Sequence, residues 1–66
     1  MPSNKVELAQ LIARRDGISF NEAMEIVDDC ANELESAFSA GSIIEAENII
    51  QDWLGLEPDY LDIFLY

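Results

Sequence analysis

Residues 20–40 read FNEAMEIVDDCANELESAFSA, and this stretch decides the fold. Its apolar side chains recur at spacings of three and four, which gathers them into one stripe along a helix of about 30 Å. The stripe consists of Phe20, Ala23, Met24, Val27, Ala31, Leu34 and Phe38. We therefore predict a long central helix whose stripe, Phe38 included, forms most of the core.

Local signals on both sides of this stretch predict further helices. Three polar residues each precede a glutamate by three positions, the spacing at which side chain and carboxylate cap a helix start reciprocally. The pairs are Asn4 with Glu7, Ser19 with Glu22 and Ser42 with Glu45. Three glycines each follow an apolar periodic stretch, where a left-handed residue commonly ends a helix. They are Gly17, Gly41 and Gly55.

These signals predict an all-α chain, a compact bundle of three helices plus a short C-terminal helix, in a single helical domain over residues 1–66. The expected bounds are about 5–15, 20–40, 43–54 and 58–65. The third helix has an apolar face, which we expect to be buried with Trp53 in the core. That face consists of Ala46, Ile50, Trp53 and Leu54.

The final segment is apolar on more than one side. Pro58 suits the first position of a helix, and six of the last seven residues are apolar. We expect this segment to cover the core with one side and to offer the other to a second chain or a partner.

The charge is strongly one-sided. The 66 residues contain 14 acids, three bases and no histidine, for a net charge of -11. All three bases lie in the first fifteen residues, at Lys5, Arg14 and Arg15. A field of this sign repels nucleic-acid phosphates and anionic membranes, so we expect no direct nucleic-acid partner and no membrane partner.

Four acids line one flank of the predicted central helix. They are Glu22, Glu25, Asp29 and Glu33. Like charges four residues apart cost about 0.2–0.5 kcal/mol per pair, and no base lies near to offset them, so stability alone does not account for the arrangement. Two interpretations stay open: a solvated face that confers solubility, or a surface that engages a cationic groove in another protein.

Several chemistries are excluded by residue type. Without histidine, the commonest general base and transition-metal ligand are missing, and no Cys-His or Ser-His pair exists. The chain has neither an EF-hand spacing nor a glycine-rich phosphate loop. We therefore predict a protein that is not an enzyme, with no catalytic residues, no cofactor and no metal site.

Cys30 is the lone cysteine and cannot form an internal disulfide. With acids as its charged neighbours it is expected to be a small, unreactive buried side chain. No apolar run has the length of a signal sequence or of a membrane span. The expected location is the reducing cytoplasm of a bacterial host cell.

The chain carries the pattern Asn4-Lys5-x-Glu7-Leu8, Ile12-Ala13, Gly17-Ile18-Ser19, Ala23, Val27 and Gly41. This pattern, a little over half of the chain, resembles the helical N-terminal half of the bacterial histone-like HU/IHF family. The resemblance implies a dimerising helical hairpin followed by a sheet and basic arms that grip DNA. It stops at Gly41, because the next segment is predicted to be helical and acids replace the bases. DNA binding is therefore not carried over.

Residues 52–61 read DWLGLEPDYL. This stretch is similar to the ends of small proteins encoded by bacteriophages and prophages. The resemblance implies a context in which short acidic proteins inhibit host DNA-directed machinery, as anti-restriction and anti-CRISPR proteins do.

Two functions from different classes follow. The first is an acidic interaction module that docks on a basic surface of a host protein, as an inhibitor or a nucleic-acid mimic, with the four flank acids in contact. The alternative is a self-assembling structural protein, a homodimer or larger oligomer joined through residues 60–66. Three further residues are contact candidates: Ile26, which projects away from the centre of its stripe, and Tyr60 and Tyr66 in the final segment.

Overall fold

The computed structural model describes residues 2–65, and every regular element in this range is helical. The elements are α1 (Lys5–Asp16), α2 (Phe20–Ser39), α3 (Ile43–Ile49), the π-helical turn η1 (Ile50–Leu54), the 3₁₀ turn η2 (Pro58–Leu61) and α4 (Asp62–Leu65). The predicted all-α class is confirmed, and the four predicted starts coincide with the observed ones. The predicted third helix is α3 continued by η1, and the short C-terminal helix is η2 continued by α4.

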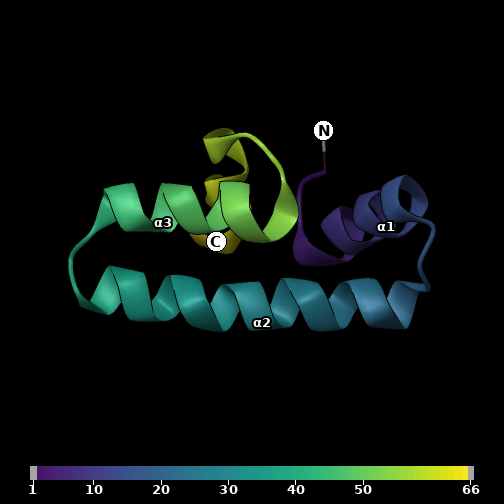
Figure 1. The fold of residues 1–66 in the computed structure, drawn as a ribbon, viewed down its shortest axis with the longest axis horizontal. Coiled ribbons are helices and arrows are strands. Elements are labelled where there is room, and N and C mark those ends of the chain that lie inside the picture. Colours follow the sequence, from purple (N-terminus) through teal and green to yellow (C-terminus); the bar gives the residue numbers. More distant parts are fainter. Residues whose placement is uncertain (1, 66) are drawn as a thin grey trace.

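The long helix α2 organises the molecule (Figure 1). The structure measures 33 × 20 × 20 Å, so α2, at about 30 Å for twenty residues, spans almost its full length. Figure 1 shows α1 and α3 lying one after the other along the same side of α2. The C-terminal segment packs against α3 and η1. The arrangement is thus two helices seated on a third, rather than three helices around a common axis.

The buried face of α2 is rotated from the predicted stripe. The fully buried residues on this helix are Ala23, Val27, Cys30, Leu34 and Ala37. Small side chains let neighbouring helices approach closely, and α1 and α3 settle on the side of α2 that carries Ala23, Cys30 and Ala37. Phe38 is consequently only half-buried, and the prediction that Phe20 lies in the core is wrong, since it is 41% exposed.

Trp53 is the second correction to the predicted core. Its side chain is 45% exposed, whereas Ala46, Ile50 and Leu54 are buried as predicted. In an α-helix Trp53 would lie within about 60° of Ile50 around the axis. The chain instead passes into the π-helical turn η1, in which each residue advances by a smaller angle. Leu54 stays inside while Trp53 falls on the outer flank.

Side-chain caps explain why the helix starts could be predicted. The cap oxygens of Asn4, Ser19 and Ser42 accept hydrogen bonds from the backbone N–H groups of Glu7, Glu22 and Glu45 at 2.9, 3.1 and 3.2 Å. Within residues 2–65 the reciprocal bond from the glutamate is not made, and the Glu7 carboxylate accepts from the Ser3 hydroxyl instead at 2.7 Å. Gly17, Gly41 and Gly55 have φ of 67°, 75° and 65°, the left-handed conformation expected at helix ends.

Arg15 joins the end of α1 to the end of η1. Its Nη1 donates a 2.6 Å hydrogen bond to the backbone carbonyl of Leu54, and its Nε lies 2.8 Å from a carboxylate oxygen of Asp16. The last carbonyls of a helix have no partner within it, and a cation there is favourable. This contact closes the chain across 39 positions of sequence.

We predict that Ile50→Ala lowers the free energy of unfolding by about 2–5 kcal/mol, because the side chain is fully buried and its removal leaves a cavity. The matched control is Ile44→Ala, since Ile44 is also helical but 74% exposed, and its change should stay within about 0.5 kcal/mol. Urea unfolding monitored by circular dichroism measures both. Equal losses in the two variants would contradict the described core.

We also predict that Arg15→Gln lowers the free energy of unfolding by about 1 kcal/mol, since it removes a charged hydrogen bond to the Leu54 carbonyl at a half-exposed site. Arg14→Gln removes the same charge from the neighbouring position, where no hydrogen bond or ion pair is made within residues 2–65. It should change stability by less than half as much. A larger loss for Arg14→Gln in the same urea series would refute the bridging role of Arg15.

Candidate functional site

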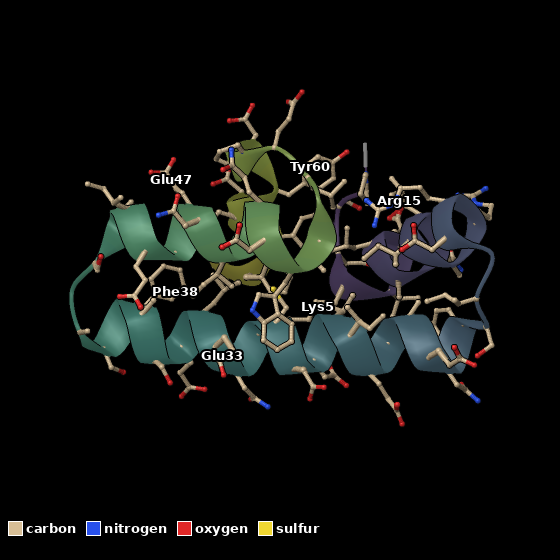
Figure 2. All side chains as sticks on the ribbon, viewed as in Figure 1. Lys5, Arg15, Glu33, Phe38, Glu47 and Tyr60 are labelled. Atoms are coloured by element: carbon tan, nitrogen blue, oxygen red, sulfur yellow. The ribbon has the colours of Figure 1, made fainter. Side chains whose placement is uncertain are left out.

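The four flank acids of α2 all face solvent. We call Glu22, Glu25, Asp29 and Glu33 the acidic flank, and each of them is exposed. Glu33 is labelled on α2 in Figure 2. Of the other acids, only Glu7 and Glu47 are half-buried, and no charged side chain is buried within residues 2–65. The flank is thus part of a surface that is anionic over most of its area.

No base neutralises the acidic flank. The one ion pair in the described part of the chain joins Arg15 to Asp16, and it raises the pKa of Arg15 and lowers the pKa of Asp16 through a direct side-chain hydrogen bond. Lys5 is directed elsewhere, with its Nζ 5.9 Å from the centre of the Phe64 ring. The charges of the flank are therefore available to a molecule outside the protein.

The other contact candidates lie apart from one another. Ile26 is half-buried on α2, on the same side of the helix as Cys30 and Glu33. Tyr60 is half-buried in η2, on a different element. Tyr66 lies outside the described residues. The structure therefore brings the four acids and Ile26 onto one helix, and it places Tyr60 elsewhere.

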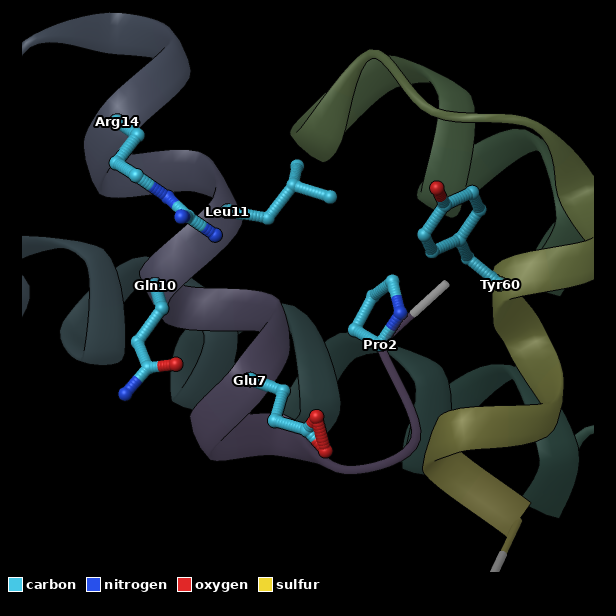
Figure 3. A pocket seen from close by; sticks show the side chains of 6 residues that line it. All are labelled: Pro2, Glu7, Gln10, Leu11, Arg14 and Tyr60. Carbon is cyan, nitrogen blue, oxygen red and sulfur yellow. The ribbon is translucent and has the colours of Figure 1, made fainter.

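Tyr60 lines a surface hollow on α1 that sequence reasoning missed (Figure 3). The hollow has a volume of about 390 Å³ and is lined by Pro2, Glu7, Gln10, Leu11, Arg14 and Tyr60. Figure 3 shows Leu11 and Tyr60 projecting toward one another from opposite sides of it. The available signal was the seven-residue spacing of Glu7 and Arg14, which places them on one face of α1.

A second hollow adjoins the first along α1. Its volume is about 300 Å³, and it is lined by Gln10, Ala13, Arg14 and Phe20. Gln10 and Arg14 belong to both hollows. Arg14 thus stands between them, exposed and without an ion pair among the described residues.

Cys30 is fully buried, as predicted. Burial, followed by the negative charge of Glu33, raises the pKa of its thiol to about 11. A neutral, inaccessible thiol is a poor nucleophile and a poor metal ligand. The position therefore serves packing between α2 and its neighbours.

No group of three or more cysteine, aspartate or glutamate side chains is arranged to hold a metal ion within residues 2–65. None of the helices in this range combines the length and the apolar character required to cross a membrane.

Comparisons of the chain with known protein families, with curated proteins and with solved structures give no match. The two resemblances noted in the sequence therefore stay predictions. What the protein does must be argued from its own surface.

We predict that the Cys30 thiol reacts with a small disulfide reagent at pH 8 about a hundredfold more slowly in the folded protein than in urea. The pKa rises from the ordinary value of 9.0 to about 11, which lowers the thiolate fraction by two powers of ten, and burial blocks access as well. Reaction at the same rate with and without urea would contradict the burial.

The same shift predicts how stability depends on pH. Between pH 9 and 11 the unfolded chain loses the thiol proton while the folded chain keeps it, so the unfolded state binds fewer protons and stability falls as pH rises. Cys30→Ala removes this contribution, and its free energy of unfolding should fall less steeply over this interval. Parallel slopes for the two proteins would show that the thiol titrates alike in both states.

Proposed function

We propose that this protein is a non-enzymatic interaction module whose acidic flank docks on a basic surface of another protein. The observation that carries the proposal is the acidic flank itself: four carboxylates on one helix, all exposed and none paired with a base in the described chain. Exposed charges of one sign raise the rate at which an oppositely charged partner is captured. The module needs no cofactor and no metal for this role.

The acidic flank lies on a rigid helix, which favours recognition by a partner. Residues 22–33 extend over about 16 Å of helix at 1.5 Å per residue. The adjoining side of the same helix is buried at Ala23, Val27 and Cys30, so the carboxylates project from an element held by the core. A surface held in one conformation loses less entropy on binding than a flexible acidic tail does.

Mimicry of nucleic acid is a narrower form of this proposal. Six acids on α2 along about 30 Å give a lower charge density than duplex DNA, which carries one charge per about 1.7 Å. Matching DNA therefore requires acids from several elements or from two copies of the chain. Exposed acids on α3, η1 and the C-terminal segment can contribute, and they include Glu45, Asp52 and Asp62.

The partner we propose is a host protein with a basic groove, of the kind that binds nucleic acid. In this proposal the chain is encoded by a bacteriophage or another mobile element, works in the bacterial cytoplasm and inhibits the partner by occupying its groove. Support for the context comes from the similarity of residues 52–61 to phage protein ends, and support for the mode of action comes from the charge of the surface.

A second candidate function is self-assembly through the C-terminal segment. Leu61 and Ile63 are buried, whereas Leu65 is 51% exposed and Tyr60 and Phe64 are half-buried. The segment thus covers the core with one side and presents apolar surface on another, which favours a contact with a second copy. In that case the acidic surface limits further aggregation.

The test of the leading proposal has two steps. Tagged protein is used to capture partners from a bacterial lysate at low and at high salt, and association with a captured partner is then followed by stopped flow. Glu25→Lys/Asp29→Lys should slow association about tenfold at low salt and flatten its salt dependence, because the steering field is lost where the partner lands.

The control variant is Glu57→Lys/Asp59→Lys, which makes the same change in net charge at exposed positions outside the acidic flank. It should slow association far less. Equal slowing in both variants would show that net charge alone matters, and an unchanged rate in the flank variant would reject the docking role.

A further inference from the structure

We infer that a second copy of this chain docks on the outer face of α1, in an antiparallel two-fold contact centred between Gln10 and Leu11. This inference goes beyond the proposed function and does not depend on it. We call the four residues of this surface the α1 face, and they are Glu7, Gln10, Leu11 and Arg14.

The α1 face lies opposite the buried side of its helix. Leu8, Ala9 and Ile12 are buried against the core, and at 100° per residue the α1 face points the other way. Glu7 and Arg14 are seven residues apart, which places them within about 20° of one another and about 10 Å apart along the axis. Along the helix the α1 face is therefore negative at Glu7, neutral in the middle and positive at Arg14.

Such a face is complementary to itself when one copy is turned around. In an antiparallel two-fold pairing, Glu7 meets Arg14 of the partner subunit, and Gln10 meets Leu11 of the partner subunit. The symmetry repeats each contact, so two ion pairs flank a central apolar and amide contact. A parallel pairing would instead bring Glu7 against Glu7 and Arg14 against Arg14.

The charge distribution of the whole chain favours the same face. The helix α1 holds all three bases and only two of the fourteen acids, so it is the one described element in which bases outnumber acids. A two-fold contact centred on the exposed side of α2 would instead bring acids against acids. Arg14 is also the base that neither an intramolecular ion pair nor an aromatic ring engages in the described chain.

The two hollows beside the α1 face offer space for apolar side chains of the second copy. Phe20 lines the second hollow together with Gln10 and Arg14, so a contact between two α1 faces brings Phe20 of the partner subunit to the edge of the interface. Phe20 is a large apolar side chain that its own fold leaves 41% exposed. Burying Phe20 at the edge of the interface removes apolar surface from water on both copies.

Sedimentation equilibrium of the full chain tests the inference through a charge swap. The wild-type protein should form a dimer with increasing concentration. Glu7→Arg and Arg14→Glu each replace two ion pairs with two like-charge contacts, and each should lower the association constant by about tenfold or more. The double variant Glu7→Arg/Arg14→Glu restores opposite charges across the contact and should recover the association constant to within about threefold.

Two controls separate this contact from the alternatives. Glu57→Arg changes the net charge as Glu7→Arg does, away from α1, and should leave the dimer intact. Leu65→Asp alters the C-terminal segment and should also leave it intact. Circular dichroism of each variant verifies folding, and the recovery expected of the double variant excludes unfolding as the cause of the single losses.

Three results would overturn the inference. They are a wild-type protein that stays monomeric up to about 1 mM, a dimer that neither single reversal weakens, and a double variant as weak as the single ones. A dimer that Leu65→Asp abolishes and the reversals spare would assign self-association to the C-terminal segment instead.

Discussion

The seating of α1 and α3 on the small buried side chains of α2 is the contact on which the rest of the structure depends. Ala23, Cys30 and Ala37 allow the two helices to approach α2 closely, and Val27 and Leu34 fill the interface. A chain of this length buries a smaller share of its surface than a larger domain, so its core has no room for charge. No charged or polar residue is buried in the described chain.

This constraint places every charged side chain of the described chain outside the core, and both proposals concern that exterior. With fourteen acids and three bases to place outside one core, the surface becomes anionic everywhere except along α1. The two proposals divide that surface between them: the acidic flank of α2 faces a basic partner, and the α1 face meets a second copy. A dimer joined at α1 would present two acidic flanks, which raises the number of carboxylates available to one extended groove.

Features specified by neighbouring residues could be predicted, and features specified by distant ones could not. The hydroxyls of Ser19 and Ser42 accept hydrogen bonds from backbone N–H groups only three residues later. The helix starts could therefore be predicted correctly from the local sequence. The rotation of the buried face of α2 toward Cys30 and the exposure of Trp53 depend on how α1, α3 and η1 pack. The local sequence pattern does not specify this packing. The acidic flank was visible as a spacing, whereas the hollow beside Tyr60 joins residues from opposite ends of the chain.

The central claim is that the acidic flank is the surface that a partner recognises. The most direct measurement is an NMR titration of the isotope-labelled chain with the captured partner, which maps the backbone amides that the partner shifts. The account predicts a footprint over residues 22–33 that fades as salt rises from low values to about 0.5 M, where charges are screened within a few ångströms. A footprint confined to the C-terminal segment and insensitive to salt would contradict it.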